Sequence, residues 1–289
     1  MDIIKNCDMS KYTSFKTGGM ADTLIIPQNL TELKEVLLEL SKTESAFLVM
    51  GNGSNILVTD KGFAGTIVKI DSAFSQIAIN DSELIADAGA LMSTVANAAM
   101  EAGLSGFEFA SGIPGSIGGA VFMNAGAYGS EMKDIVKYVN MVSKDGANEY
   151  KLSADEMKFS YRHSILQETG SIVTSVVLDL KKENPQEIRA RMNDLMEQRN
   201  EKQPVSLPSA GSFFKRPSGN FAGKLIEDAG LKGLSIGGAK VSELHAGFIV
   251  NYNNATAADI IDLMHVIQHT VKDRFGVVLE PEVQIIGEI

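Results

Sequence analysis

The chain has 289 residues, and its 26 Lys plus Arg against 36 Asp plus Glu give a net charge of −10. At roughly 150 residues per domain this length predicts two domains, and the acidic balance argues against a protein that grips nucleic acid through its phosphates. Hydrophobic residues make up 44% and charged residues 21% of the chain, which indicates an ordered globular protein. The 27 glycines exceed average usage and are clustered.

The single cysteine, Cys7, cannot form an internal disulfide, which fits a reducing compartment. Residues 1–10 carry charges and no apolar run, so no signal peptide is expected. No stretch approaches the roughly 18 apolar residues that a membrane span needs. We therefore expect a cytoplasmic protein that binds neither nucleic acid nor a membrane. A monomer is expected separately, since none of these observations determines the oligomeric state.

The first two-thirds of the chain alternate short strands with glycine turns. β-Branched runs bounded by Gly, Asn or Pro predict strands at Asp22–Pro27, Ala46–Met50, Asn55–Thr59, Thr66–Ile70, Ile135–Val142 and Ser171–Leu180, and a hairpin from Gln76–Asn80 and Glu83–Ala88. Asn29 and Glu32 form a capping pair in front of apolar residues at helical spacing, and a second helix is predicted at Leu91–Ala102.

The composition shifts near Lys181, and we place the domain boundary there, with residues 1–182 as one domain and 183–289 as the other. Helices are predicted at Pro185–Lys202 and Phe221–Ala229. A capping box of Thr256 and Asp259 opens a long helix that Gly276 stops. Val277–Ile286 is predicted to close the chain as a strand.

Two segments dense in glycine are candidate phosphate-binding loops. The first, Gly51-Asn52-Gly53-Ser54-Asn55, lies between two predicted strands, where a glycine turn exposes consecutive backbone N–H groups that can bind an anion. An ordinary Asn-Gly turn is the alternative. The segment is not a Rossmann fingerprint, because Ile56 stands where the third glycine is required and a strand follows it.

The second segment, Ser111-Gly112-Ile113-Pro114-Gly115-Ser116-Ile117-Gly118-Gly119, continues through Asn124-Ala125-Gly126. Residues without a side chain let the backbone come close to a ligand, at an entropic cost on folding. Two such loops about sixty residues apart favour a long phosphate-bearing ligand, such as a dinucleotide.

Candidate catalytic side chains lie in the second half of the chain. Arg162 can hold a carboxylate through a bidentate pair, although a lone arginine is more often a surface residue. Ser212 precedes two phenylalanines and two cations, and it could donate or relay a proton or belong to a solvated loop. Its spacing to Lys215 is also that of acyl-serine enzymes of the penicillin-binding type, but their Lys-Thr-Gly triad, here residues 16–18, comes in the wrong order.

Two further pairs of polar residues are candidates for chemistry. Glu280 and Glu282 flank Pro281, which indicates an edge strand or a bulge. A buried glutamate there could donate a proton with a raised pKa, and an exposed pair is the alternative. His265 and His269 share one helix face, but they lack a third ligand and the glutamate of a zinc site, so no metal is expected.

In their order along nearly the whole chain, from residues 13–19 (TSFKTGG) to 279–283 (LEPEV), these segments closely resemble the UDP-N-acetylenolpyruvoylglucosamine reductase family. The resemblance implies an α+β fold, with an FAD-binding domain of the vanillyl-alcohol-oxidase type and a smaller C-terminal α+β substrate domain. It implies that NADPH reduces bound FAD. A hydride then reaches the enolpyruvyl group of UDP-N-acetylglucosamine enolpyruvate, and the product is UDP-N-acetylmuramate for peptidoglycan synthesis.

The resemblance also implies roles for individual residues. The expected FAD contacts are Gly51, Asn52, Gly53, Ser54, Asn55, Ser111, Gly112, Ile113, Pro114, Gly115, Ser116, Gly119, Asn124 and Gly126. Arg162 and Glu282 match the pair that stabilises negative charge building toward the substrate carboxylate, and Ser212 matches the general acid. Lys202, Arg216 and His245 align with substrate contacts, although some relatives have Asn or Gln in place of Arg216 and His245.

One departure points to a shorter subclass of the family. Longer members insert a loop with a substrate-covering Tyr after the Tyr-Arg-x-x-Ser segment, whereas here Tyr161–Ser164 runs almost directly into the strand at Ser171. The FAD loops alone would also permit another FAD-dependent oxidoreductase of the same superfamily, such as an oxidase of small alcohols or sugars. Two more functions compatible with these motifs are a non-enzymatic UDP-sugar binder and the acyl-serine enzyme.

Overall fold

The computed structural model describes residues 1–288, which form two compact units, each assembled from segments far apart in the sequence. Unit 1 comprises Met1–Ile4, Thr23–Asn52 and Gly65–Gln198. Unit 2 comprises Lys5–Asp22, Gly53–Ala64 and the chain from Arg199 onward. The predicted division at residue 182 separates an FAD-binding from a substrate-binding part of the chain, and it stays a prediction.

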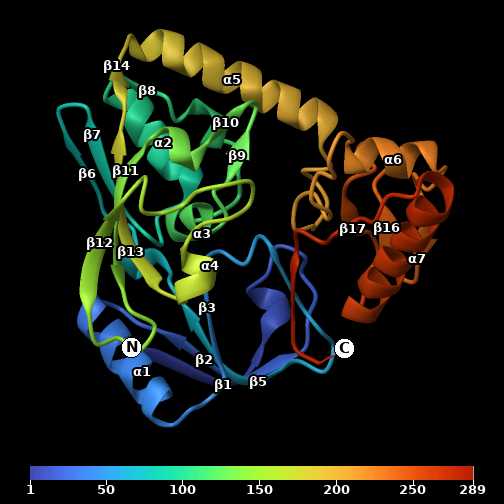
Figure 1. Cartoon of the computed structure of the whole chain (residues 1–289), viewed down its shortest axis with the longest axis horizontal. Coiled ribbons are helices and arrows are strands. Elements are labelled where there is room, and N and C mark those ends of the chain that lie inside the picture. The colour runs from blue at the N-terminus through green and yellow to red at the C-terminus, as the bar shows by residue number, and fades with distance from the viewer. Residues whose placement is uncertain (289) are drawn as a thin grey trace. The chain divides into compact units, whose positions relative to one another are not determined.

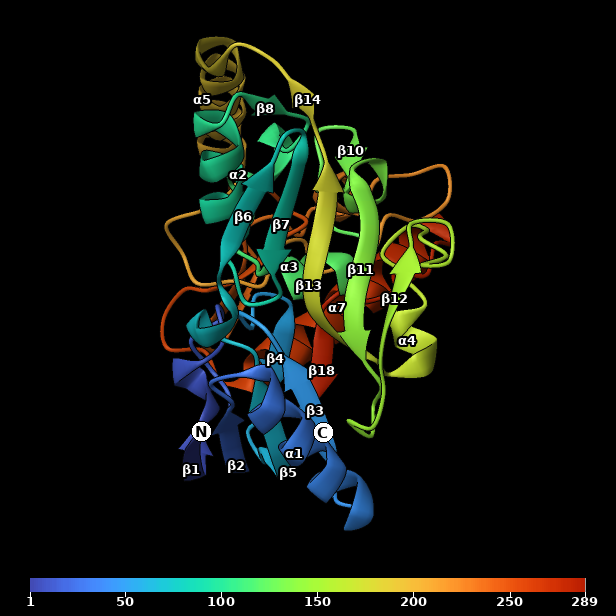
Figure 2. The ribbon, with the colours of Figure 1, turned by 90° about the vertical axis from the view of Figure 1, so that its left-hand side faces the viewer.

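Two larger sheets (Figure 1) lie in unit 1, except that three strands of the first extend into segments of unit 2. The first has the order β1-β2-β5-β3, with β3 and β5 parallel, and its strands are β1 (Asp2–Asp8), β2 (Met20–Ile26), β5 (Phe63–Lys69) and β3 (Phe47–Met50). The second is antiparallel with the order β12-β11-β13-β7-β6, and Figure 2 shows its strands side by side: β12 (Glu149–Ser153), β11 (Val136–Val142), β13 (Ile172–Asp179), β7 (Glu83–Asp87) and β6 (Ile77–Asn80). The strands predicted in this part of the chain and the β6–β7 hairpin are therefore confirmed.

The helices of unit 1 follow from local signals in the sequence. The Asn29 side chain accepts a hydrogen bond from Glu32 N (2.9 Å) at the start of α1, and Gly103 follows α2 with φ of +67°. The apolar residues of α1 are buried, as their spacing predicts. The helices are α1 (Leu30–Lys42), α2 (Met92–Glu101), α3 (Ile117–Phe122), α4 (Leu166–Thr169) and most of α5 (Pro185–Lys202).

Short elements complete unit 1 and its core. Two strand pairs are formed by β8 (Leu104–Ser105) with β14 (Lys181–Lys182) and by β9 (Gly126–Ala127) with β10 (Ser130–Glu131). Three 3-10 turns are found at Ser72–Phe74, Glu108–Ala110 and Met132–Asp134. Helix α3 packs against β13. One apolar core joins residues from Leu33 to Met192.

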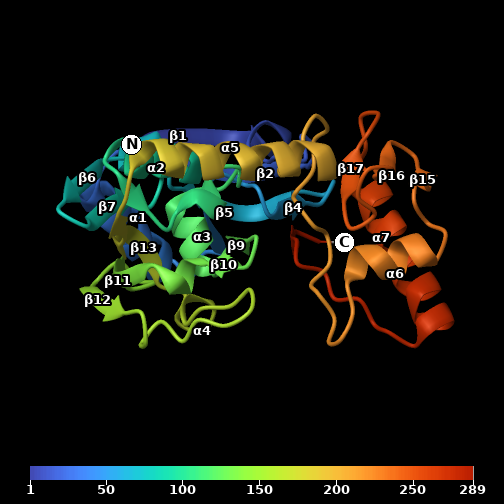
Figure 3. The same ribbon diagram turned by 90° about the horizontal axis from the view of Figure 1, so that it is seen from above.

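Unit 2 is a smaller α+β assembly with its own core (Figure 3). A 3-10 turn at Met9–Lys11 lies near its start, and β4 (Ile56–Val58) pairs in parallel with β18 (Gln284–Ile286). A three-stranded sheet of β15 (Ser235–Ile236), β16 (Ala239–Val241) and β17 (Ile249–Asn251) packs against α7 (Ala257–Phe275). Helix α6 (Ala222–Asp228) also contacts α7. Its core reaches from Phe15 to Val283.

Helix α7 begins and ends where its sequence predicts. The capping box of Thr256 and Asp259 is present, and Gly276 ends the helix with φ of +69°. A distant carboxylate adds to this start, because Asp60 accepts hydrogen bonds from Ala257 N (2.9 Å) and Ala258 N (2.8 Å). The N-terminal N–H groups are thus satisfied partly from a loop that precedes the helix by almost 200 residues.

The predicted strand Val277–Ile286 is wrong for most of its length, because only Gln284–Ile286 forms a ladder. Upstream, Pro281 makes an isolated bridge with Phe214, flanked by hydrogen bonds from Lys215 N to Glu280 O and from Glu282 N to Phe213 O (both 2.8 Å). Proline has no N–H to donate, so this pairing does not extend. The polar strand β1, in contrast, was not predicted at all.

Within residues 1–288, none of the helices combines the length and apolar character required to cross a bilayer.

Candidate active site

The two predicted phosphate loops meet inside unit 1. Asn52 donates a hydrogen bond from Nδ2 to the Pro114 carbonyl oxygen (2.6 Å). Gly51 lies so close to Ser116 that a Cβ added at Gly51 would overlap the Ser116 hydroxyl. The missing side chain of Gly51 therefore makes room for Ser116, which explains the glycine at this position.

Ser116 is the most informative residue of the second loop. Its side chain is only 2% exposed, and its Oγ has no hydrogen-bond partner within residues 1–288. A buried hydroxyl without a partner is costly, so a ligand that accepts a hydrogen bond there would relieve the cost. A phosphate of FAD is such an acceptor, and the residues present fit this group.

The neighbouring glycines serve different purposes. A Cβ at Gly118 would press on Ala88, so this glycine allows α3 to pack closely on the chain that follows β7. Gly119 and Pro114 are exposed, and a Cβ at Gly119 would meet only the Ser116 hydroxyl, at 3.6 Å. The loop thus contains both packing glycines and residues accessible to a ligand.

Replacing Ser116 by alanine is expected to weaken FAD binding by about 10-fold, because a hydrogen bond to a charged group contributes about 1.5–3 kcal/mol. The unfolding free energy of the apoprotein is expected to stay constant or rise, because the variant removes an unpartnered hydroxyl. Titration of apoprotein with FAD and urea unfolding measure the two effects. Ser164→Ala is the matched control: Ser164 is equally buried but donates to Phe122 O (2.8 Å), so its loss should destabilise the apoprotein.

Asn124 is fully buried and has a left-handed backbone conformation, with φ of +43°. Its Nδ2 donates to Glu131 Oε2 and to Ser160 O (both 2.9 Å), and its Oδ1 accepts from Lys133 N (3.0 Å). These bonds occupy the side chain, so any contact with a bound flavin is left to the backbone of this segment. The sequence did not single out Glu131, which lies at the centre of the group.

Arg162 lies at the tip of a tight turn closed by the pairing of Ser160 with His163. Its φ is +54°, and its guanidinium stacks on the ring of Tyr161 at 5.0 Å. Burial raises the pKa of Glu131, but hydrogen bonds from Lys133 and Asn124 and the charges of Lys133 and Arg162 outweigh it, so that the pKa lies below its usual value. Ser160 belongs to this turn, so the hydrogen bond from Asn124 to Ser160 O links the buried asparagine to the turn that carries Arg162.

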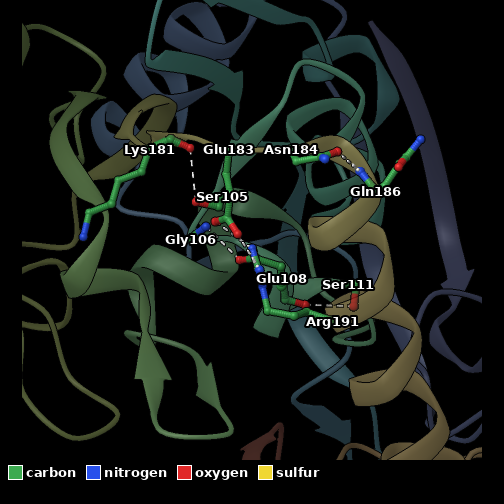
Figure 4. A network of polar contacts seen from close by, with 9 residues as sticks. All are labelled: Ser105, Gly106, Glu108, Ser111, Lys181, Glu183, Asn184, Gln186 and Arg191. Atoms are coloured by element: carbon green, nitrogen blue, oxygen red, sulfur yellow. Dashed lines mark hydrogen bonds and ion pairs between the residues drawn. The ribbon is translucent and has the colours of Figure 1, made fainter.

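A network of charges supports the start of the second loop (Figure 4). Arg191 of α5 donates to Glu108 from Nη2 (2.7 Å) and Nε (3.1 Å), and to Glu183 from Nη1 (2.6 Å). Hydrogen bonds from both carboxylates raise the pKa of Arg191, which stays charged. Because Ser111 Oγ donates to Glu108 O (2.9 Å), the network fixes the turn that precedes the loop.

In unit 2, three distant segments with predicted roles are hydrogen-bonded together. Glu282 N donates to Phe213 O (2.8 Å), next to Ser212, and the Asn55 Nδ2 donates to Glu282 O (3.1 Å). Ser212 itself is exposed, and its Oγ makes no hydrogen bond within the described chain. The segments of Ser212 and Glu282 and the Asn55 side chain of the first phosphate loop therefore belong to one hydrogen-bond network.

The acyl-serine interpretation finds no geometric support. Lys215 pairs with Glu280 through Nζ and Oε2 (3.4 Å) and makes no contact with the Ser212 hydroxyl. Glu280 is exposed rather than buried, which leaves the half-buried Glu282 as the carboxylate of interest in this segment.

The predicted substrate residues occupy different parts of the chain. Lys202 is the exposed last residue of α5. The Arg216 guanidinium lies 3.9 Å from the ring centroid of Phe221, and His245 lies against Gly223, two residues further on. Burial lowers the pKa of His245, and its Nδ1 accepts a hydrogen bond from Gly247 N (3.1 Å).

The lowered pKa of His245 predicts a dependence of stability on pH. Because the folded pKa lies below the value of 6.5 for a free side chain, the contribution of the neutral imidazole is complete above pH 6.5 and is lost as the pH falls through the folded pKa. We expect the difference in unfolding free energy between wild type and His245→Gln to shrink between pH 7.5 and pH 5. Urea unfolding at both pH values measures this difference, and an equal difference at both would contradict the assignment.

Comparison with known proteins first defines a class. The family described as "FAD binding domain" matches residues 21–148, and the family described as "UDP-N-acetylenolpyruvoylglucosamine reductase, C-terminal domain" matches residues 203–286. The chain is therefore an FAD-binding oxidoreductase with a second, C-terminal domain. The predicted fold class is confirmed as an FAD-binding domain followed by a smaller C-terminal α+β domain.

Full-length relatives then specify the family. A UDP-N-acetylenolpyruvoylglucosamine reductase of Caldanaerobacter subterraneus is 52% identical over 98% of this chain and 93% of its own length. That of Clostridioides difficile is 49% identical over 99% and 94%. The crystal structure of the Thermus caldophilus enzyme has a TM-score of 0.84 at 36% identity and covers 99% of this chain and 98% of its own. The chain belongs to the UDP-N-acetylenolpyruvoylglucosamine reductase family.

Proposed function

We propose that this chain is an FAD-containing enzyme that uses NADPH to reduce the enolpyruvyl group of UDP-N-acetylglucosamine enolpyruvate, giving UDP-N-acetylmuramate for peptidoglycan synthesis. The observation that carries the residue roles is the hydrogen-bond network of unit 2. It ties the segment of Ser212 to that of Glu282, and Glu282 to Asn55 of the first phosphate loop.

FAD is proposed to lie against the two glycine loops. The buried, unpartnered Ser116 hydroxyl, for which Gly51 makes room, supports a phosphate at this point. Asn52, Gly53, Ser54 and Asn55 of the first loop and Ser111 to Gly115 of the second would supply further contacts, with Gly119, Asn124 and Gly126 nearby in the sequence. When bound, FAD supplies the redox chemistry by accepting a hydride from NADPH and passing it to the substrate.

The chain's own residues handle the charge and the proton. Negative charge builds toward the substrate carboxylate as the enol ether is reduced, and the proposed role of Arg162 is to stabilise it, with Glu282 beside the same carboxylate. The rigid turn around Arg162 limits the reorganisation that this task requires. Ser212 is proposed to deliver a proton to the alpha carbon, and its exposed hydroxyl, which has no partner within residues 1–288, is available for this step.

Lys202, Arg216 and His245 are proposed to contact the UDP-sugar. His245 is suited to donate a hydrogen bond at neutral pH, because its Nδ1 already accepts one and the ring proton therefore resides on Nε2. We further propose that residues 1–182 serve the cofactor and 183–289 the substrate, and that the protein acts in the cytoplasm as a monomer, without nucleic acid or membrane partners.

A two-part experiment tests the proposal. The purified protein should be yellow and release FAD on denaturation, and it should oxidise NADPH only when the enolpyruvyl substrate is present. Oxidation of small alcohols or sugars by oxygen, without turnover of the enolpyruvyl compound, would favour another flavoenzyme of the superfamily. Covalent labelling by a penicillin would favour the acyl-serine enzyme.

A further inference from the structure

Two side chains with proposed substrate contacts, Arg216 and His245, converge on the start of α6 in unit 2. Arg216 lies over the ring of Phe221, the residue that immediately precedes the helix. Gly223, in the first turn, lies against His245, since a Cβ there would be 3.1 Å from the imidazole Cε1. The first residues at the start of α6 therefore adjoin two groups that are both expected to contact the substrate.

The fold gives no structural reason for a phenylalanine at this position. The ring of Phe221 is 60% exposed, whereas Ala222, Leu225 and Ile226 of the same helix are buried in the core of unit 2. Phe221 occupies the N-cap position but makes no side-chain cap hydrogen bond. Neither packing nor capping thus requires an aromatic ring here.

The pair formed by Phe221 and Arg216 is suited to a flat, neutral, aromatic ligand. The guanidinium covers one face of the ring, so the exposed area lies on its edge and its other face. Nucleobases stack on such rings, and adjacent guanidinium groups strengthen the binding. The nearby Arg216 charge and the Nε2–H of neutral His245 suit phosphate groups attached to the same ligand.

We propose that Phe221, held in place by Arg216, is the stacking platform for the uracil base of the UDP-sugar. This inference rests on the proposed function and adds to it a position that binds the base. Stacking on an aromatic side chain is sequence-tolerant, so Phe221 contributes affinity for a nucleotide, and the hydrogen-bonding groups around it decide which base is preferred.

Unit 2 offers a matched control in Tyr252. This ring is 57% exposed and lies beneath the Lys240 ammonium at 4.0 Å, so it is a cation–aromatic pair of the same kind. It lies at the end of β17, beside Gly238, and none of the proposed substrate residues contacts it. Removal of Tyr252 therefore tests whether any exposed aromatic ring in this unit has the same effect.

Calorimetric titration of the FAD-loaded protein with UDP and with inorganic pyrophosphate tests the proposal. We expect Phe221→Ala to weaken UDP binding about 10-fold and to raise the KM for the UDP-sugar similarly, with pyrophosphate affinity within twofold of wild type. Phe221→Trp should keep UDP affinity within threefold, and this variant keeps the test valid if the alanine variant folds poorly. Tyr252→Ala should bind UDP like wild type.

Three results would overturn the inference: UDP affinity of Phe221→Ala within twofold of wild type, an equal loss of UDP and pyrophosphate binding in that variant, or an equal loss in Tyr252→Ala. Failure of the proposed function gives a different result. If wild type binds no UDP, the proposed substrate class is wrong, whereas normal wild-type binding with an unaffected Phe221→Ala contradicts the base platform alone.

Discussion

Ser212→Ala is expected to separate the two halves of the catalytic cycle. Reduction of the flavin by NADPH should proceed at close to the wild-type rate, because this half needs no proton from the serine. Reoxidation by the enolpyruvyl substrate should slow by at least about 100-fold, since a positioned general acid contributes roughly 10²–10⁴-fold. Stopped-flow absorbance of the flavin measures each half separately.

The fold should tolerate this substitution, because Ser212 is exposed and its hydroxyl makes no hydrogen bond within residues 1–288. Ser218→Ala provides the control: Ser218 is an exposed serine six residues further along, and within residues 1–288 only its backbone carbonyl is used, by Asn220 Nδ2 (3.3 Å). Reoxidation of Ser212→Ala at the wild-type rate would remove the serine from the mechanism.

Gly51→Ala is expected to lower the affinity for FAD by roughly 100-fold, because overpacking costs about 1–3 kcal/mol and here displaces the loop itself. The added methyl group would overlap the Ser116 hydroxyl, and either that hydroxyl or the Gly51 backbone has to move. Gly51 does not have a positive φ, so the effect comes from contact and not from backbone strain. Titration of apoprotein with FAD measures the loss.

The double variant Gly51→Ala/Ser116→Ala separates this clash from other causes. Without Oγ, the nearest atom to the new methyl group is the Cβ of residue 116, at 3.4 Å, which is an ordinary contact. The double variant should therefore bind FAD as Ser116→Ala does, and the two substitutions should be strongly non-additive. Additive losses would show that Gly51 matters for a reason other than Ser116.

Local sequence signals predicted the helices well, because a helix finds its hydrogen-bond partners within its own segment. Capping residues, a stop glycine and apolar spacing define α1 and α7, because a helix satisfies its hydrogen bonds within one segment. The last strand was overpredicted since Val277–Val283 alternates like a strand, yet a ladder requires a neighbour, and Phe213–Lys215 offers only one bridge. The exposed strand β1 has too few apolar residues to show a pattern.

The candidate site was predicted as a set of segments but not as a set of contacts. The glycine loops were visible in the sequence, whereas the meeting of Gly51 with Ser116 joins the end of strand β3 to the start of helix α3, about sixty residues away. The Asn124 group likewise joins Glu131 to Ser160, and no local pattern marks either partner. Charges such as Arg191 and Asp60 read as ordinary surface residues, because their partners lie 83 and about 200 residues away.

The parallel pairing of β18 with β4 has a consequence for dividing the chain. Residues 203–286 match as a domain, but β18 finds its partner in residues 56–58, and the buried Asn251 side chain donates to Phe15 O (3.0 Å). A fragment that begins at residue 203 would expose the edge of β18 to solvent. It would also leave the buried Asn251 amide without its hydrogen-bond acceptor. The C-terminal region is thus recognised as a domain from its sequence, but we do not expect it to fold alone. Its fold also requires residues 5–22 and 53–64, which belong to the same unit.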